Sequence, residues 1–590
     1  MQSRLLRSPK RLSITLAAVM LLAGTAVTAP QMLTTRKSAK TAASAATYTT
    51  LAGAFNNTAV SDDGAPTAAN FDKAGASFSA QDLAAYGWGP GQAITYAGTK
   101  LTWPNVAAGK PNNVVAASQV ITLSGKGKNL TFVTAADHGP STGTGKITYS
   151  DGTTSSYTLT APDWVGGNPA QALINLPHRN SSSGQQAGPA QLFTVNIPLN
   201  TSKTVSSVTL PGTPTVGRIH IFALSIRPIT TGWTATWGTA TERAMAVGPW
   251  TNETLRMVVR SSVGGTSARV RFENTYNTAP VTIGHATIAV QQDGWTPKAT
   301  PVTVTFGGNK SVTIPAGGEA ISDAATISIP ANSRLLVSEY FPGSITAATV
   351  HMNALETNYN AFAGAGDHTA DLANYPLSNT FAFTTFLAGV DVSSSAGAVV
   401  ALGDSITDGI GAGWDTDTRW PDYLSNRLGG TRGVVNEGIA GNQILTDLVN
   451  GGGMAATNRQ FRDVIGIPGV KSLVLHEGTN DINAGASAAA VEAGLKQIVS
   501  LAHTYGIKVY ISPITPASNY TADKQAVRSA VNSWIYAGSS GADGLADFRV
   551  AITVGGNPEA MYSIYDSGDH LHPNSAGYNS MANIIDVTKL

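Results

Sequence analysis

The sequence contains no cysteine, which excludes disulfide bonds, thiolate nucleophiles and cysteine-bound metals. Charged residues are also scarce, at 12% of the chain against roughly 25% in an average soluble protein. Their signs balance, with 37 Lys and Arg against 36 Asp and Glu, so neither a nucleic acid nor an anionic surface is indicated as a partner. Core burial alone must hold the 590 residues together, and a chain of this length is expected to form several domains.

The N-terminus has the pattern of a secretory signal peptide. Basic residues up to Arg11 precede an apolar stretch over residues 12–22, and small residues continue to Ala29. An uncleaved membrane anchor is the alternative, because the apolar stretch approaches spanning length, but its small-residue second half favours cleavage. We predict a signal peptide over 1–29, a spacer over 30–47, and a secreted protein without integral membrane association after cleavage.

Two regions with the alternation of β-strands follow, over residues 48–230 and 231–395. Asp151 and Gly152 stand between two such runs and are typical of a hairpin. We predict two all-β sandwich domains. In the second region arginines alternate with apolar residues, which predicts a solvated strand face; these are Arg256, Arg260, Arg269 and Arg271.

The tryptophans of the first β region can be interpreted in two ways. Trp88, Trp103 and Trp164 are candidates for a sugar-stacking platform or for core residues, and the core is favoured because nothing places them on one face. Residues 55–64 resemble a module of secreted bacterial carbohydrate-active enzymes, so this domain is a possible carbohydrate-binding domain. In the second region His351, Asp367 and His368 lack metal-ligand spacing and are interpreted as structural residues.

From about residue 393 strands and helices alternate. Apolar runs predict strands at 398–402, 432–436, 472–476, 507–512 and 544–548. The predicted helices are 420–428, 486–503, 521–537 and 575–586. Such alternation predicts a parallel sheet with helices on both faces, and five strands favour a flavodoxin-like three-layer domain over residues 396–590.

Four polar blocks lie at the ends of these strands or just before a helix, and ligands of open α/β sheets bind beyond strand ends. Alone, each block is typical of an ordinary turn or cap, whereas all four in order indicate a site. They are Gly-Asp-Ser-Ile-Thr-Asp-Gly at 403–409, Asn-Glu-Gly-Ile-Ala-Gly-Asn at 436–442, Glu-Gly-Thr-Asn-Asp at 477–481, and Asp-Ser-Gly-Asp-His-Leu-His-Pro at 566–573.

With these blocks, residues 396–590 resemble the SGNH hydrolases of the GDSL esterase/lipase superfamily. The resemblance covers about a third of the chain, and the preceding β region also resembles one that accompanies this domain in secreted bacterial members. It implies Ser405 as the nucleophile, with Asp569 and His572 as acid partner and base. It further implies an oxyanion hole formed by the N–H groups of Ser405 and Gly441 and by the side-chain amide of Asn480.

The chemistry of the residues agrees with this resemblance. A serine hydroxyl needs a base to take its proton, and a carboxylate three residues before the histidine can fix the imidazole tautomer. His570 with Asp566 is the alternative pair, but its spacing is one residue longer. Ile406 stands where the family has leucine, which is a conservative change. Asp404 and Asp408 are expected to form hydrogen bonds within their loop. No role is assigned to His476.

The predicted activity is therefore hydrolysis of a carboxylic ester through an acyl-enzyme. The accessory β domain favours deacylation, such as deacetylation, of a carbohydrate or another small acyl ester, and a lipase or phospholipase-type acylhydrolase is the alternative. A glycoside hydrolase using Glu437 and Asp481, or a carbohydrate-binding protein on the same scaffold, is a further alternative. The expected partner is an ester substrate, an acylated polysaccharide or a lipid, and no cofactor or metal is implied.

Overall fold

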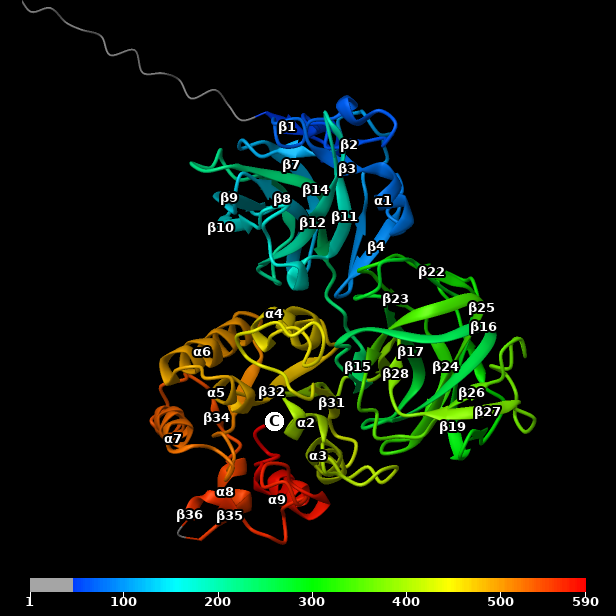
Figure 1. Cartoon of the computed structure of the whole chain (residues 1–590), viewed down its shortest axis with the longest axis vertical. Coiled ribbons are helices and arrows are strands. Elements are labelled where there is room, and N and C mark those ends of the chain that lie inside the picture. Colours follow the sequence, from blue (N-terminus) through cyan, green and yellow to red (C-terminus); the bar gives the residue numbers. More distant parts are fainter. Residues whose placement is uncertain (1–45, 556) are drawn as a thin grey trace, which may run out of the picture. The chain divides into compact units, whose positions relative to one another are not determined.

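The computed structural model describes residues 46–555 and 557–590 (Figure 1). These residues belong to one structural unit, Ala45–Leu590. The predicted signal peptide and nearly all of the predicted spacer lie outside the described residues. Within the described part, no helix combines the length and the apolarity that a membrane crossing requires.

The first β region forms two facing sheets around a shared core. One sheet has the order β1 (Thr47–Tyr48), β7 (Val120–Gly125), β13 (Val205–Thr209), β9 (Ser141–Tyr149), β10 (Thr154–Ala161). The other has the order β2 (Val60–Ser61), β3 (Ser77–Ser79), β11 (Ile174–Ser181), β12 (Gly184–Pro198), β8 (Asn129–Asp137), β14 (Arg218–Arg227), β6 (Val114–Val115). The hairpin β4 (Ala93–Tyr96) and β5 (Thr99–Thr102) and the helix α1 (Ala80–Ala85) complete the region. Asp151 and Gly152 form the predicted turn between β9 and β10.

The three tryptophans of this region are core residues. Trp88, Trp103 and Trp164 are 0%, 4% and 3% exposed, and the ring of Trp103 packs edge to face against that of Trp88. The core interpretation is therefore correct, and the sugar-stacking platform is wrong, because no open indole face remains for a ligand.

The second β region also contains two sheets. The first comprises β15 (Trp233–Gly238), β29 (Leu387–Ser393), β17 (Gly265–Glu273) and β23 (Glu319–Ile321), with β24 (Ala325–Ile329) paired to β17. The second has the order β20 (Thr296–Pro297), β19 (His285–Asp293), β25 (Arg334–His351), β16 (Arg243–Arg260), β26 (Asn358–Ala361), β27 (Leu377–Phe381), with β21 (Val302–Val304) and β28 (Thr384–Thr385) at its sides. The short pair β18 (Val281–Ile283) and β22 (Val312–Ile314) lies apart from both.

The prediction of a solvated arginine face is wrong. The side chains of Arg260 and Arg269 are only 11% and 19% exposed, and each lies against an aspartate. Arg256 is 0% exposed: its guanidinium donates to the Ser338 hydroxyl and to backbone carbonyls, and it stacks on the Tyr375 ring. Arg271 is 9% exposed and lies beside Glu273. Both sites supply the partners that a buried charge requires, and alternation alone cannot reveal such partners.

The C-terminal region is the predicted parallel sheet. Its order is β31 (Gly433–Gly438), β30 (Ala398–Gly403), β32 (Val470–His476), β33 (Lys508–Ile511), β34 (Gly544–Leu545), which is the doubly wound order 2-1-3-4-5. Val400 and Leu402 on β30 face a core that includes Leu495 and Ile498 of helix α6 (Ala488–Thr504). Val399 faces a core built with helices α3 (Trp420–Leu428) and α9 (Ser575–Ile584). Both faces are covered, which explains the unbroken apolar strands.

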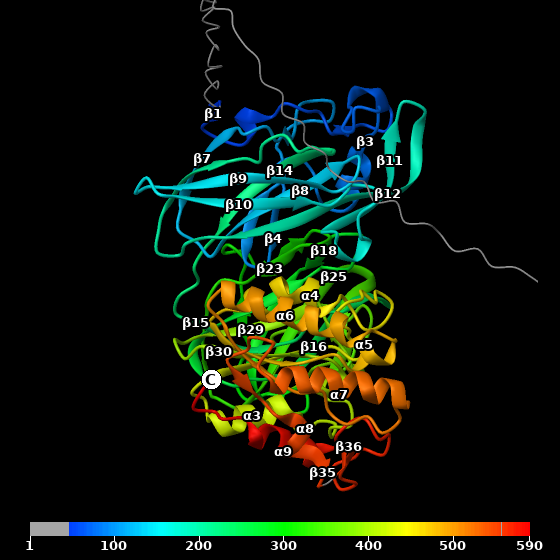
Figure 2. The ribbon, with the colours of Figure 1, turned by 90° about the vertical axis from the view of Figure 1, so that its left-hand side faces the viewer.

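The predicted helices are present with small shifts of their ends: α3 (Trp420–Leu428), α6 (Ala488–Thr504), α7 (Ala522–Tyr536) and α9 (Ser575–Ile584). Figures 1 and 2 show α3 and α9 packed side by side. The predicted strand 544–548 is wrong in its second half, because Asp547 accepts a hydrogen bond from the N–H of Val550 and caps α8 (Phe548–Ile552). The remaining short elements are α2 (Ser405–Asp408), α4 (Ala456–Gln460), the π-helix η4 (Phe461–Ile465), α5 (Thr479–Asn483), β35 (Thr553–Val554) and β36 (Asn557–Met561).

The second β region covers the edge strand β31 of the parallel sheet. β15 continues into Thr239, which forms a parallel bridge with Asn436, and the Ser262 hydroxyl accepts a hydrogen bond from the N–H of Val434 at 2.8 Å. An uncovered edge strand offers unpaired backbone groups to other chains, so this contact protects the sheet at the strand that leads into the second polar block.

Gly238 tests this contact. A Cβ at this position would lie 2.3 Å from Val435 Cγ1 and 3.1 Å from Glu437 Oε1. We expect Gly238→Val to lower the free energy of unfolding by about 1–3 kcal/mol, measured by urea denaturation. Gly343→Val is the matched control, since a Cβ there meets nothing within 4 Å. Equal stability of the two variants would show that the β15–β31 contact is not close-packed.

Candidate functional site

Ser405 lies at the point where β30 ends and α2 begins. The Asp404 side chain accepts a hydrogen bond from the N–H of Ile406 and caps the helix, and Gly409 ends it in the left-handed conformation, with φ +114°. Ser405 is the first helical residue, so its own N–H has no partner within the helix. The turn therefore presents both the hydroxyl and the N–H of Ser405 beyond the strand end.

The C-terminal loop brings an imidazole and a carboxylate to this serine. Ser405 Oγ lies 2.8 Å from His572 Nε2, and His572 Nδ1 lies 2.5 Å from Asp569 Oδ2. Asp569 Oδ1 accepts hydrogen bonds from the N–H groups of Leu571 and His572. Burial opposes ionisation of Asp569, but the hydrogen bonds from His572 and the backbone outweigh burial and lower the pKa of Asp569 to about 2. The carboxylate is thus charged where it faces the imidazole.

The alternative pair in the same loop does not reach the serine. His570 Nδ1 lies 2.7 Å from Asp566 Oδ2, and the His570 side chain is 68% exposed. The structure therefore brings together Ser405, His572 and Asp569, and leaves His570 and Asp566 as a separate surface pair.

Ser405, Gly441 and Asn480 each keep an N–H donor that no acceptor among the described residues uses. Gly441 adopts φ +79° in the loop after β31, a conformation that favours glycine. Within the described part of the chain, neither the Ser405 N–H nor the Gly441 N–H donates to a protein acceptor. Asn480 Nδ2 donates one hydrogen to the Asn442 carbonyl oxygen at 2.9 Å, which fixes the amide and leaves its second hydrogen for a ligand.

The buried guanidinium of Arg459 donates hydrogen bonds to three segments of this site. It donates to Gly403 O at 3.1 Å, to Glu437 O at 2.7 Å and to Asn442 Oδ1 at 2.9 and 3.0 Å. These acceptors lie at the end of β30, near the end of β31 and in the Gly441 loop. Arg459 was missed in the sequence because it stands in none of the four blocks; an arginine in a short helix carries no pattern that distinguishes it from a surface residue.

A second buried arginine completes this cluster. Asp463 Oδ2 accepts hydrogen bonds from both Arg459 and Arg462, each at 3.1 Å. Burial raises the pKa of Glu437 and of Glu477 well above the usual range, so both carboxyls favour the neutral form here. The π-helix η4 holds Arg462 and Asp463 on the turn after Arg459.

The carboxylates considered for glycosidic cleavage do not fit that use. Glu437 and Asp481 are each 1% exposed, and both oxygens of Asp481 accept backbone N–H bonds, from Ile444 and Leu445. A glycoside hydrolase needs two carboxyl groups that face the scissile bond from either side. Among the described residues there is also no cluster of three or more His, Asp or Glu side chains with the geometry to hold a metal ion.

The second β region contributes side chains to the nucleophile loop. Asp408 accepts a hydrogen bond from Asn353 Nδ2 at 2.9 Å and from the Ala440 N–H at 3.0 Å, and its other oxygen lies 3.2 Å from His351 Nε2. Burial would lower the pKa of His351, but Asp408 and Glu242 raise it. His351 is thus structural, as expected, and it supports Asp408, which lies in the Ser405 turn and bonds to the Gly441 loop through the Ala440 N–H.

Arg459→Lys tests the role of the guanidinium. Lysine keeps the charge beside Asp463 but cannot reach three acceptors with a planar fork, so we expect the kcat for p-nitrophenyl acetate to fall about 10²-fold with KM little changed. The measurement is steady-state hydrolysis, with circular dichroism to confirm folding. Arg528→Lys is the matched control, because Arg528 is 2% exposed and its partners among the described residues are Gln525, Ile514 and Pro558, all outside the four blocks. Equal kcat values for the two variants would remove Arg459 from the site.

Two protein-family models match parts of this chain. The family model described as GDSL-like Lipase/Acylhydrolase family matches residues 401–579, and the model described as AziU2-like beta-sandwich domain matches residues 46–228. A search of curated proteins finds no match.

Solved structures resemble about a third of the chain. They include a GDSL-like lipase from Bacteroides thetaiotaomicron, at 20% identity and TM-score 0.27, covering 33% of this chain and 87% of that one. A member of the lipolytic protein G-D-S-L family from Veillonella parvula has 23% identity and TM-score 0.27, with 33% and 99% covered. A carbohydrate acetylesterase from Sinorhizobium meliloti has 15% identity and TM-score 0.26, with 32% and 94% covered.

The family match agrees with the four blocks, with the parallel sheet and with the position of Ser405. Residues 46–228 of the chain are therefore similar to the AziU2-like β-sandwich domain, and residues 401–579 are similar to the GDSL-like lipase/acylhydrolase family.

Proposed function

We propose that this protein hydrolyses a carboxylic ester through an acyl-enzyme on Ser405, with His572 as general base and Asp569 as the acid partner. The observation that carries the proposal is the continuous hydrogen-bonded path from Ser405 Oγ through the imidazole to Asp569. His572 Nε2 takes the hydroxyl proton as Oγ attacks the ester carbon, and later returns it to the departing alcohol. A water molecule then attacks the acyl-enzyme in the same way, with His572 again as the base, and the carboxylic acid is released.

The negative oxygen of the tetrahedral intermediate needs donors that are already in place. The N–H groups of Ser405 and Gly441 and the second amide hydrogen of Asn480 fill this role in the proposal, and each such donor contributes roughly 3 kcal/mol. Asp569 stays ionised throughout, in keeping with its pKa of about 2, and stabilises the imidazolium that forms.

We further propose that the natural substrate is an acylated carbohydrate, with acetyl as the acyl group, outside the cell. The first β region places amide side chains against the hydrolase domain: Asn168 Nδ2 lies 2.6 Å from Asp447 Oδ2, and Gln171 Nε2 lies 3.4 Å from the same oxygen. Asp447 lies six positions after Gly441 in the sequence, so these amides meet the segment that follows the Gly441 loop. Such a polar surface suits a polyhydroxylated substrate better than a lipid. The predicted signal peptide supports the extracellular setting.

Ser405→Ala tests the nucleophile. We expect the kcat for p-nitrophenyl acetate to fall about 10⁴-fold or more, because the attacking oxygen is removed while the fold is kept. A fluorophosphonate probe, read by mass spectrometry, should label Ser405 in the unaltered protein and nothing in the variant. Thr407→Ala is the matched control for the loss of a nearby hydroxyl. Retained hydrolysis in Ser405→Ala, or labelling of another residue, contradicts the mechanism.

The substrate class is tested by a series of p-nitrophenyl esters from acetyl to palmitoyl, together with acetylated xylan and phosphatidylcholine. We expect the kcat/KM to be highest for acetyl and to fall about tenfold or more by octanoyl, with acetate released from the polysaccharide. A maximum at long chains, with fatty acid released from the phospholipid, would instead identify a lipase or phospholipase-type acylhydrolase.

A further inference from the structure

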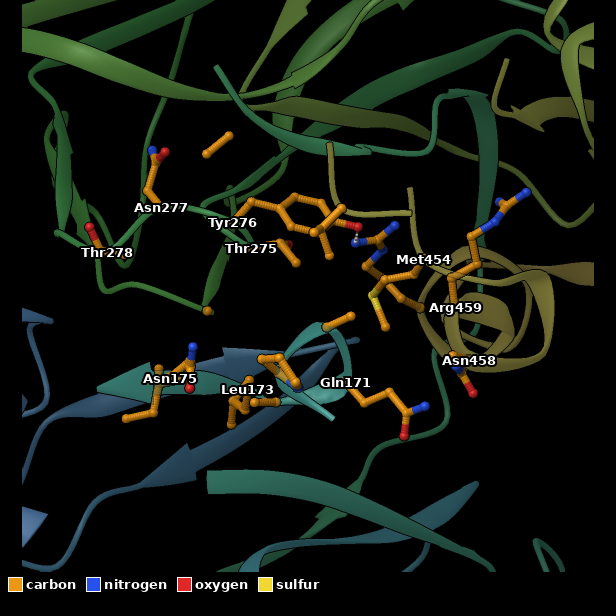
Figure 3. Close-up of a pocket in the computed structure, with 18 of the residues that line it drawn as sticks. Gln171, Leu173, Asn175, Thr275, Tyr276, Asn277, Thr278, Met454, Asn458 and Arg459 are labelled. Atoms are coloured by element: carbon orange, nitrogen blue, oxygen red, sulfur yellow. Dashed lines mark hydrogen bonds between the residues drawn. The ribbon is translucent and has the colours of Figure 1, made fainter. Parts of the chain in front are cut away.

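A cavity of about 360 Å³ lies where the two β regions meet the hydrolase domain (Figure 3). It is separate from the contact between Ser405 and His572. The first β region contributes Tyr86, Tyr96 and the segment 169–175, the second contributes 275–278, and the hydrolase domain contributes residues between 449 and 462. Residues far apart in the sequence thus line one cavity that is partly open to solvent.

The lining combines aromatic faces with neutral polar groups. Tyr86, Tyr96 and Tyr276 line the cavity together with the amides of Gln171, Asn175 and Asn458. In Figure 3 the Tyr276 ring forms one wall, and Leu173 and Gln171 lie on the opposite side. No acidic side chain and no lysine is among the described residues that line it.

The two arginines at the cavity are already paired. Arg462 donates to the Tyr276 hydroxyl at 3.2 Å, and its guanidinium carbon lies 5.6 Å from the centre of the Tyr276 ring. Arg462 and Arg459 both bond to Asp463. These charges are compensated inside the protein, so the cavity offers no free charge that would select an anion or a cation.

We propose that this cavity is a binding site for a neutral saccharide, distinct from the ester-cleaving site. Tyrosine rings pack against the C–H face of a sugar ring, and amide side chains both donate to and accept from its hydroxyl groups. An acyl chain fits less well, because it offers no hydrogen-bonding group to the Tyr, Asn and Gln side chains that line the cavity.

The cavity borders the segment that follows the Gly441 loop, which belongs to the proposed ester-cleaving site. Met454 lines the cavity, and its carbonyl oxygen accepts a hydrogen bond from Asn442 Nδ2 at 2.7 Å. Arg459 lines the cavity and holds the Asn442 side chain. A sugar residue bound here lies against the segment that follows the proposed oxyanion loop, so the cavity serves to hold a carbohydrate chain on the enzyme.

The test is binding of xylotetraose, cellotetraose and chitotetraose to the unaltered full chain by isothermal titration calorimetry, with sodium octanoate as the acyl-chain probe. Xylotetraose and cellotetraose carry no ester, and the amides of chitotetraose are not esters, so the measurement does not depend on Ser405 or on the proposed hydrolysis. We expect at least one of the three oligosaccharides to bind and octanoate not to compete. Binding of octanoate alone, or of none of the probes, overturns the proposal.

Two variants locate the binding. Ala244 is exposed on β16 and lines the cavity, so Ala244→Trp fills the space without removing an internal contact. Tyr276→Ala removes the aromatic wall. We expect each to weaken binding about tenfold or more. Ala246→Trp is the matched control, since Ala246 is exposed on the same strand but does not line the cavity.

The same variants separate this proposal from the proposed activity. Ala244→Trp should hydrolyse p-nitrophenyl acetate at the rate of the unaltered protein, because that small ester does not need the cavity. If saccharide binding is unchanged in Ala244→Trp and in Tyr276→Ala, the cavity is not the binding site, whatever the outcome for Ser405.

Discussion

The guanidinium of Arg459 satisfies backbone and side-chain acceptors at the ends of two parallel strands and in the loop that carries Gly441. Carbonyl groups at such strand ends are removed from water once the helices cover the sheet, and each needs a donor to avoid a cost of about 1–3 kcal/mol. One planar, always charged group supplies donors in several directions at fixed angles. The relative position of the Ser405 turn and the Gly441 loop therefore depends on a residue that belongs to neither.

A buried cation must in turn be compensated, and this requirement extends the site into its surroundings. Asp463 pairs with Arg459 and Arg462, and Arg462 continues to the Thr241 carbonyl and the Tyr276 hydroxyl in the second β region. On the other side of the loop, Asp408 is held by His351 and Asn353 of the same region. Removing one member would leave another charge buried and unpaired, which is strongly destabilising. The β region is thus part of the scaffold that positions the loops, and its role goes beyond covering the sheet edge.

The parts of this arrangement that could be predicted from the sequence are those with a local pattern. The strands 398–402 and 472–476 are apolar on both faces because helices cover both, and Ser405 was found because the resemblance fixes it within a block. His351 and Arg459 had no such pattern, since the site residues that they hold, Asp408 and Asn442, belong to other segments of the chain. The same reason explains the errors: Arg256 and Arg271 alternate as surface residues would. Their acceptors on distant strands, the Ser338 hydroxyl and the Ala388 carbonyl oxygen, lie beside them only in the folded chain. The last predicted strand ends early, because Asp547 caps helix α8 and this local interaction competes with continuation of the strand.

The cavity between the β regions and the hydrolase domain follows from the same geometry. The two β regions and the hydrolase domain leave a space where they meet. Tyrosine rings and amide groups line this space, and the charged Arg459 at its wall is paired with Asp463. Arg459 lies at this wall and also beneath the Gly441 loop, so one rigid group is shared by both places. A ligand in the cavity and the loop that carries Gly441 would thus be linked through Asn442, which bonds both to Arg459 and to the Met454 carbonyl oxygen at the cavity wall.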